Sequence, residues 1–252
     1  MVDRGWALVT GASRRIGRAL ALAAATAGHD VIVHARAAPE DAAETGRAIE
    51  ALGRRHAVRL GELAAPDVCK RLLQPDAELG GRPITLLVNC ASAFEDDRIE
   101  TLTPDGWDAA MASNARAPVL LSQAFAAALP PDRQGLIVNI TDQRVWRPTP
   151  EFFSYSLSKA ALWDATRMLA QALAPRIRVN AIAPGPTLAS VHQSPADFAA
   201  EAGAVPLGHG PTPEEIGQAL AFLIAAPSVT GQMIAVDGGQ HLAWRTPDVL
   251  DG

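Results

Sequence analysis

The chain of 252 residues has little charge, little cysteine and few aromatic side chains. Charged residues make up 19%, the net charge is −5, and no long basic run occurs, so nucleic acid is not expected as a partner. No apolar run approaches the length of a membrane span, so we expect no membrane insertion. The two cysteines, Cys69 and Cys90, lack the spacing of metal ligands. We therefore expect reduced thiols, a cytoplasmic protein and no metal site.

Hydrophobic residues make up 48% of the chain, which argues against intrinsic disorder and allows a large core. Short apolar segments alternate with longer amphipathic ones. We expect strands at residues 6–10, 31–35, 57–63, 84–89, 136–141, 178–182 and 233–236. We expect helices at residues 15–27, 42–52, 67–79, 104–129 and 152–174, and one that opens at Thr212 with a capping box.

This alternation of helices with nearly continuous apolar strands predicts a parallel sheet with helices on both faces. The first strand, its glycine turn and the following helix are typical of dinucleotide-binding folds. We therefore predict an α/β fold, a single domain over residues 1–252 with a Rossmann-type, doubly wound sheet of seven strands. Residues 183–211 are rich in Pro, Gly, Ser and His, and we expect a lid loop at about 186–211.

The turn between the first strand and the first helix reads Thr-Gly-Ala-Ser-Arg-Arg-Ile-Gly, from residue 10 to residue 17. Gly11 permits a tight turn, and Gly17 permits close packing of the helix on the strand. Free N–H groups at the start of the helix can then bind a pyrophosphate. The predicted cofactor contacts in this turn are Gly11, Ser13, Arg14, Arg15, Ile16 and Gly17.

The second expected strand ends in His34-Ala35-Arg36 and has no acidic residue there. Folds that select NAD usually carry Asp or Glu at this place, bound to the ribose 2′-hydroxyl. Arg36, aided by Arg14 or Arg15, could instead bind a 2′-phosphate, because a guanidinium matches phosphate geometry. We therefore predict NADPH/NADP as the cofactor. The alternative interpretation is that these arginines form only a solvated rim.

The segment Ser-Tyr-Ser-Leu-Ser-Lys, residues 154–159, contains the only tyrosine of the chain and one of its two lysines. On a helix, Tyr155 and Lys159 lie four residues apart on one face. A free tyrosine has a pKa of about 10 and is a poor acid or base at neutral pH, but a nearby ammonium lowers that pKa. We therefore predict a catalytic pair; the alternative is an incidental surface pair.

These features together resemble the short-chain dehydrogenase/reductase family over almost the whole chain, from Val9 to Gly239. The resemblance implies that Asn114, in Ser-Asn-Ala, is a catalytic asparagine, that Tyr155 is the acid and that Lys159 is its partner. The stretch Asn-Cys-Ala-Ser at residues 89–92 is similar to a structural motif of the family. The further cofactor contacts that we expect are His34, Glu62, Leu63, Asn89, Ala91, Ser92, Tyr155, Lys159, Pro184, Gly185 and Thr187.

Three departures from the family pattern are informative. The family usually has glycine in place of Arg15 and Ser92, and a catalytic serine in place of Asp142. With Phe94, these residues resemble one subgroup, the pteridine reductases and the bacterial dihydromonapterin reductases. The resemblance implies that the substrate is a pterin.

The chemistry of a pterin fits these departures. An ionised Asp142 would repel the oxyanion that develops on a ketone, whereas the nitrogen of a pterin C=N bond must gain a proton, which an Asp142–Tyr155 pair can supply. Phe94 could stack on the flat ring, and Arg15 could hold both a cofactor phosphate and the pterin carbonyl. Each residue also has a plainer interpretation: Asp142 as a turn residue, Phe94 as packing beside Trp146, and Arg15 as a phosphate contact only. The predicted substrate contacts are Arg15, Ser92, Phe94, Asp142, Trp146, Tyr155 and Leu188.

The sequence thus predicts an NADPH-dependent reductase of a dihydropterin or a dihydrofolate-type substrate, a small molecule. A carbonyl reductase or alcohol dehydrogenase of the same fold is the first alternative, and a catalytically inactive NADP-binding sensor is the second. The resemblance also implies a homotetramer, with the expected helices at residues 104–129 and 152–174 as candidate interface elements.

Overall fold

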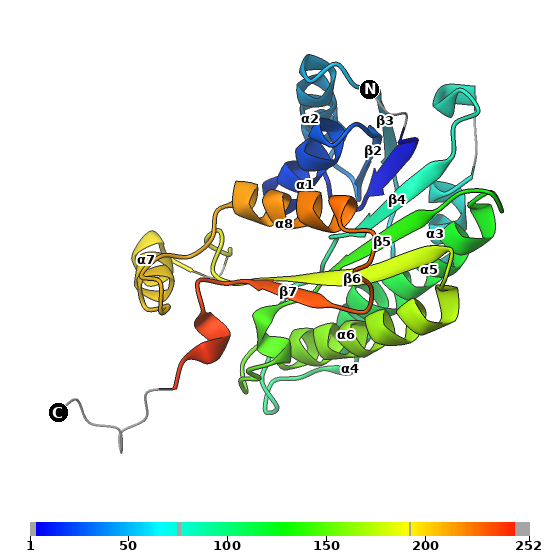
Figure 1. Cartoon of the computed structure of the whole chain (residues 1–252). Helices are drawn as coiled ribbons and strands as arrows, with labels where there is room; N and C mark the ends of the chain where they lie inside the picture. The colour runs from blue at the N-terminus through cyan, green and yellow to red at the C-terminus, as the bar shows by residue number, and fades with distance from the viewer. Residues whose placement is uncertain (1–3, 75–76, 192, 245–252) are drawn as a thin grey trace.

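Parallel strands form one central sheet in the computed structural model, which describes residues 4–74, 77–191 and 193–244 (Figure 1). Within these ranges the sheet has seven strands in the order β3-β2-β1-β4-β5-β6-β7. The predicted doubly wound topology is therefore confirmed, and every expected strand is present. The strands are β1 (Trp6–Val9), β2 (Asp30–Ala35), β3 (His56–Leu60), β4 (Ile84–Asn89), β5 (Gly135–Ile140), β6 (Ile177–Pro184) and β7 (Met233–Val236).

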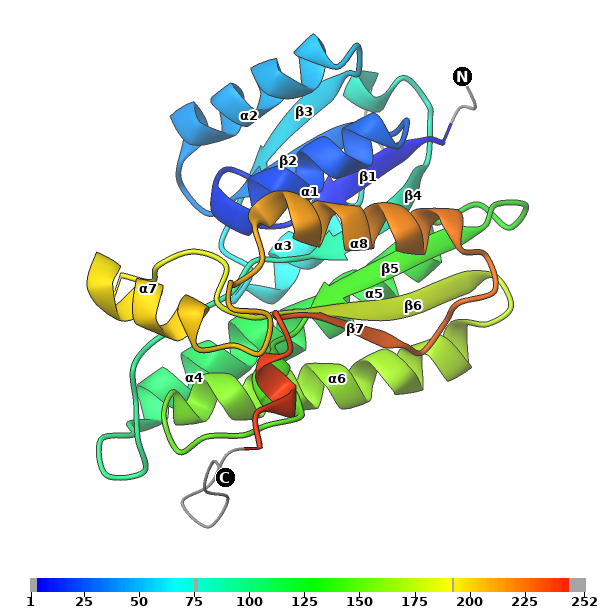
Figure 2. The ribbon, with the colours of Figure 1, turned by 60° about the vertical axis from the view of Figure 1, so that its left-hand side comes forward.

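Helices cover both faces of the sheet, as the alternation predicted (Figures 1 and 2). One face carries α1 (Arg15–Thr26), α2 (Pro39–Ala51) and α8 (Pro213–Ala225). The other face carries α3 (Pro66–Leu72), α4 (Pro104–Met111), α5 (Ala117–Ala128) and α6 (Phe153–Leu173). The helix α7 (Pro195–Gly203) lies beyond the carboxyl ends of β6 and β7 (Figure 2). Within the described ranges, no helix has the length and apolarity needed to cross a bilayer.

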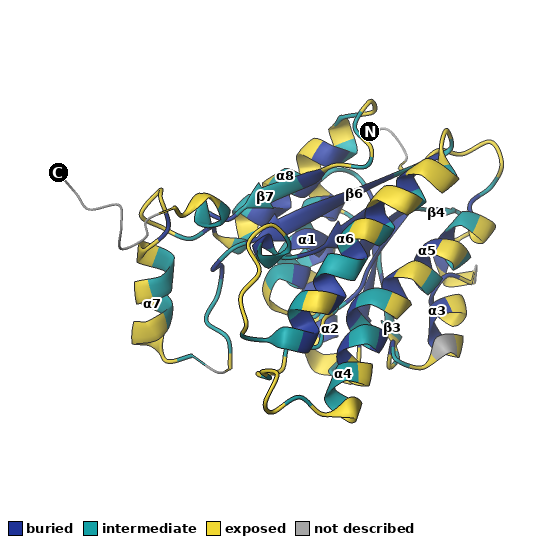
Figure 3. Ribbon diagram, turned by 90° about the horizontal axis from the view of Figure 1, so that it is seen from below, coloured by how far each residue is buried: buried dark blue, intermediate teal, exposed yellow. Residues whose placement is uncertain are grey.

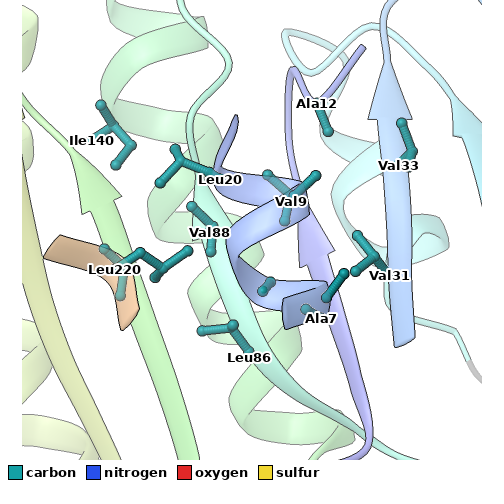
Figure 4. Close-up of a cluster of buried hydrophobic side chains, with 14 of the residues drawn as sticks. Ala7, Val9, Ala12, Leu20, Val31, Val33, Leu86, Val88, Ile140 and Leu220 are labelled. Carbon is teal, nitrogen blue, oxygen red and sulfur yellow. The ribbon is translucent and has the colours of Figure 1, made fainter. Parts of the chain in front are cut away.

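Alternate residues of each buried strand point to opposite faces, which divides the core into two large apolar clusters. Ala7 and Val9 of β1 pack with Leu20 of α1 and Leu220 of α8 (Figure 4). Trp6 and Leu8 of β1 point the other way, toward α3 and α5. The inner strands are therefore buried on both sides, whereas the helices keep exposed outer faces (Figure 3). This double coverage explains why the strand sequences are almost continuously apolar.

The structure corrects two of the expected helices. The expected helix at 104–129 is interrupted by a π-helical turn, Ala112–Arg116, between α4 and α5. Such a turn inside a helix often marks a functional position. The expected helix at 67–79 ends at Leu72, and a separate 3-10 turn covers Ala77–Leu79.

The lid was predicted as a loop, but part of it is α7. The Ser194 hydroxyl accepts a hydrogen bond from Asp197 N, the Asp197 carboxylate accepts one from Ser194 N, and Pro195 occupies the first helical position. This is a complete capping box. The segment Ser-Pro-Ala-Asp therefore carries a helix-start signal. The prediction of a loop gave more weight to the Pro and Ser content of the region than to this signal.

Candidate active site

Three of the four predicted catalytic side chains, Asp142, Tyr155 and Lys159, come together where β5 ends and α6 begins. The Tyr155 hydroxyl donates a hydrogen bond to Asp142 Oδ2 at 2.7 Å. Lys159 follows one helical turn later, and its Nζ lies 5.6 Å from the centroid of the Tyr155 ring. The Lys159 ammonium donates to the carbonyl of Ile140, the last residue of β5, at 2.7 Å. The end of the strand thus fixes the lysine behind the tyrosine.

The structure corrects the expected direction of the Tyr155 pKa. Burial raises the pKa of Tyr155 well above its usual value, and the neighbouring Asp142 carboxylate raises it further, against a smaller lowering effect of Arg144. The sequence argument had the Lys159 ammonium lowering this pKa, but the buried surroundings of the phenol and its carboxylate partner outweigh that effect. Tyr155 is therefore protonated at neutral pH and suited to donate a proton. Burial lowers the pKa of Lys159 itself to about 8.

Asp142 has a different partner at each oxygen. Its Oδ1 accepts a hydrogen bond from the backbone N of Arg144 at 2.8 Å, which caps a 3-10 turn at Gln143–Val145. Its Oδ2 accepts from Tyr155. Asp142 is thus the cap of a turn, as its plainer interpretation held, and also the hydrogen-bond partner of Tyr155. The cap holds the carboxylate in position for the phenol.

Asn114 lies in the π-helical turn, fully buried, and its side chain is saturated with hydrogen bonds. Its Oδ1 accepts from Ala93 N at 2.8 Å and from Ser92 Oγ at 3.0 Å. Its Nδ2 donates to Ala93 O at 2.8 Å and to Ser158 Oγ at 2.9 Å. The side chain therefore joins the loop after β4 to α6, and it positions Ser92 beside the catalytic helix.

The aromatic contacts differ from those expected. Phe94 stacks on Phe152, with ring centroids 4.4 Å apart and 12° between the planes. It also meets Tyr155 nearly at a right angle, with centroids 4.7 Å apart. Trp146 instead lies against His241, at 5.0 Å between centroids. Sequence reasoning missed Phe152, although the doublet of phenylalanines directly before the Ser-Tyr-Ser segment is a visible signal.

The glycine turn has the shape that a dinucleotide requires. A Cβ on Gly11 would lie 2.9 Å from Ala91 Cα, and one on Gly17 would lie 2.0 Å from Gly11 O. Arg14 and Arg15 are exposed at the start of α1, and among the described residues no side chain caps this helix. N–H groups at such a helix start can bind an anion. Ser13 and Ile16 border the same turn.

His34 lies beneath this turn and does not face the solvent. Its side chain is buried, Gly11 N donates to Nδ1 at 3.3 Å, and Nε2 lies 3.0 Å from Gly61 O. The histidine therefore supports the glycine turn, and its ring is not available to a phosphate. Arg36 is available, since 80% of its side chain is exposed and its nearest ionic contact is Glu62 at 3.9 Å. Leu63 is part of the apolar core.

Arg15 connects the glycine turn to the lid. Its Nη2 donates to Ala189 O at 2.9 Å and to Leu188 O at 3.2 Å. Arg15 also has a positive φ of 54°, which few residues other than glycine adopt. Thr187 is buried, and its hydroxyl donates to Gly185 O at 3.0 Å. The remaining predicted cofactor contacts, Asn89, Ala91 and Pro184, lie at or just after the carboxyl ends of β4 and β6. Asn89 Nδ2 donates to Asn139 Oδ1 at 2.8 Å, and Ala91 N donates to Thr10 Oγ1 at 3.1 Å.

Comparison with known proteins gives several full-length similarities. A family model described as enoyl-(acyl carrier protein) reductase matches residues 11–241. The 3-oxoacyl-[acyl-carrier-protein] reductase FabG of Aggregatibacter actinomycetemcomitans is 32% identical over 92% of this chain and 97% of its own length. The crystal structure of FolM alternative dihydrofolate reductase 1 from Brucella suis, in complex with NADP, is 46% identical with a TM-score of 0.93, and the match covers 99% of this chain and 100% of that chain. A putative short-chain alcohol dehydrogenase from Sinorhizobium meliloti is 31% identical with a TM-score of 0.88, over 96% and 98% of the two chains.

Proposed function

The chain belongs to the short-chain dehydrogenase/reductase family, and we propose that it is an NADPH-dependent reductase of a C=N bond in a dihydropterin ring. The observation that carries this proposal is the hydrogen bond of 2.7 Å between the Tyr155 hydroxyl and Asp142 Oδ2. The sequence identity of 46% to FolM, a protein described as an alternative dihydrofolate reductase, supports the same substrate class.

The residues around the glycine turn fit NADP. The open start of α1 and the close packing at Gly11 and Gly17 suit a pyrophosphate, and the exposed Arg36 suits a 2′-phosphate. The NADP in the FolM structures supports this choice of cofactor. When bound, NADPH supplies the hydride. The chain itself supplies alignment, a buried site and the proton.

Tyr155 donates the proton in this proposal. Its raised pKa keeps the phenol protonated until a ring nitrogen beside it gains basicity. Loss of that proton would place a phenolate next to the Asp142 carboxylate. The buried Lys159 ammonium and the nearby Arg144 offset this negative charge. Asp142 is partly exposed, so it is the route by which solvent returns the proton to the pair.

Reduction of a ketone is the second candidate, because several relatives are named 3-oxoacyl-[acyl-carrier-protein] reductases. In that reaction a negative charge develops on the carbonyl oxygen, and a carboxylate beside Tyr155 opposes it. A ketone reductase should therefore keep or gain activity when Asp142 is replaced by serine. A pterin reductase should lose most of its activity in the same variant.

The test is NADPH consumption by the purified wild type and by Asp142→Ser, with dihydropterins, dihydrofolate and a set of ketones side by side. We expect pterin turnover that falls by about 10²-fold in the variant, since general acid catalysis contributes about 10²–10⁴-fold and Asp142 holds the Tyr155 hydroxyl and resupplies its proton in this proposal. Phe153→Ala, a change outside the hydrogen-bonded pair, is the control. Ketone turnover without pterin turnover in the wild type would refute the proposal in favour of the second candidate.

A homotetramer in the cytoplasm is the remaining part of the proposal. A surface hollow of about 710 Å³ between α4, α5 and α6 is lined mostly by alanines, together with Met111, Val119 and Leu120 and the charged residues Asp108 and Arg116. Small side chains let helices approach closely, which supports these helices as interface elements. Sedimentation of the purified chain tests the assembly, and a monomer at micromolar concentration would refute it.

A further inference from the structure

The helix that carries Tyr155 starts from a strained residue. Phe152 precedes α6 with φ 51° and ψ 53°, in the left-handed region that disfavours a side chain with a Cβ. Glycine or asparagine adopts this backbone at lower cost. Strained residues of this kind concentrate at functional sites, where the surroundings hold them in place. The contacts of the Phe152 ring therefore matter.

The Phe152 ring lies in a column of side chains that leads to the proposed proton donor. Phe152 stacks on Phe94 at 4.4 Å and 12°. The guanidinium carbon of Arg144 lies 4.9 Å from the centroid of the Phe152 ring. Phe94 in turn contacts the Tyr155 ring at 4.7 Å and 88°. Phe152 thus stacks on the aromatic ring that contacts Tyr155 nearly at a right angle.

The loop that carries Phe94 is fastened to the same start of α6. Ser154 N donates to Asp97 Oδ1 at 3.1 Å, and Phe153 N donates to Asp97 O at 3.1 Å. Asp97 therefore caps the helix, a role that the side chain of Phe152 cannot fill. These backbone bonds place the two loops, but they leave the rotation of the Phe94 ring to its aromatic neighbours.

We propose that Phe152 is a positioning residue that orients the Phe94 ring beside Tyr155, and that it thereby favours flat heterocyclic substrates over acyclic ones. A flat ring gains contact from an aromatic side chain only when the planes are correctly oriented. An acyclic ketone has no such requirement. The inference rests on the proposed function for its choice of a pterin as substrate.

The test compares Phe152→Gly, Phe152→Tyr and the neighbouring Phe153→Ala. Glycine fits the left-handed backbone, so Phe152→Gly removes the ring while the fold is kept, which a melting curve checks. The first readout is binding of pterin to the NADP⁺ complex, followed by pterin fluorescence, in which no hydride is available. The second is NADPH oxidation with a dihydropterin and with an acyclic β-ketoester.

We expect Phe152→Gly to weaken pterin binding by about three- to tenfold, the range of one aromatic contact. The same variant should raise KM for the dihydropterin more than it lowers kcat, and it should change ketoester turnover by less than about twofold. Phe152→Tyr and Phe153→Ala should bind pterin as the wild type does.

Unchanged pterin binding in Phe152→Gly would overturn the inference. A parallel loss of pterin and ketoester activity would also overturn it, since it would reveal a purely structural role. A wild type that binds pterin in a Phe152-dependent way but does not reduce dihydropterin would refute the proposed function and support the positioning role. A wild type that does not bind pterin would refute both.

Discussion

Replacement of Gly17 by alanine should damage the dinucleotide site from within α1. Alanine is the better helix former by about 1 kcal/mol, so helix propensity alone predicts a more stable protein. The structure predicts the opposite, because the new Cβ would lie 2.0 Å from Gly11 O and 2.7 Å from Gly11 C. Real Cβ atoms essentially never come closer than 3.0 Å to another heavy atom, and both neighbours here belong to the backbone. The turn or the helix must therefore move by about 1 Å.

This movement has two measurable consequences. Overpacking of this kind costs about 1–3 kcal/mol, which lowers the Tm of a chain of this size by roughly 2–12 °C. A shift of the turn also misplaces the N–H groups that would bind the pyrophosphate. Hydrogen bonds to a charged group contribute about 1.5–3 kcal/mol, so NADPH binding should weaken by roughly 10- to 100-fold.

The assay is a melting curve together with a fluorescence titration of NADPH, with Gly203→Ala as the matched control. Gly203 also lies in a helix, α7, and a Cβ there would meet nothing within 4 Å. The control should bind NADPH as the wild type does and keep its Tm. Wild-type NADPH affinity and Tm in Gly17→Ala would refute the steric argument, and with it the close approach of helix and turn.

Three further predictions concern charge. Burial, with smaller effects of nearby arginines, lowers the pKa of His29 to about 4. Between pH 6.5 and 4, the unfolded chain therefore binds a proton at His29 that the folded chain does not bind. The free energy of unfolding should fall by about 3 kcal/mol as the pH drops through this window. Urea denaturation from pH 7 to pH 4 measures this fall, and a slope equally steep in His29→Gln would contradict it. Arg36→Ala should raise KM for NADPH by roughly 10- to 100-fold and leave KM for NADH unchanged, since only NADPH has the 2′-phosphate; an equal rise for both cofactors would speak against a phosphate contact. Burial lowers the pKa of Lys159 to about 8, so kcat/KM should decline as the pH rises through about 8, and Lys159→Arg should move that decline to higher pH if it retains activity.

The strands and the glycine turn were predictable because their signals are local. A strand that is buried on both faces is expected to be apolar at nearly every position, and β1 and β5 follow this rule with every residue buried. Gly11 has φ 65°, a conformation that the turn after β1 needs and that glycine supplies. The spacing of Tyr155 and Lys159 also follows from the helix alone.

The errors arose where a local signal was ambiguous. The sequence at 104–129 is alanine-rich on both sides of Asn114. Its composition therefore does not indicate the π-helical turn at that residue. His34 was expected as a cofactor contact from the family resemblance. Alternation along β2 turns its ring into the protein, where both nitrogens bind backbone groups.

The sequence by itself determined the fold class, the family and the types of residue available for chemistry, since periodicity, turn residues and motif spacing act over a few neighbouring positions. Only the tertiary structure decided which of these residues meet. Tyr155 and Asp142 are thirteen positions apart. Their hydrogen bond exists because α6 begins at the edge of the sheet where β5 ends. Phe94 and Phe152 are 58 positions apart and stack because Asp97 ties the loop after β4 to the start of α6. The pKa of Tyr155 likewise depends on burial and on the Asp142 carboxylate, which arise only when distant segments pack together.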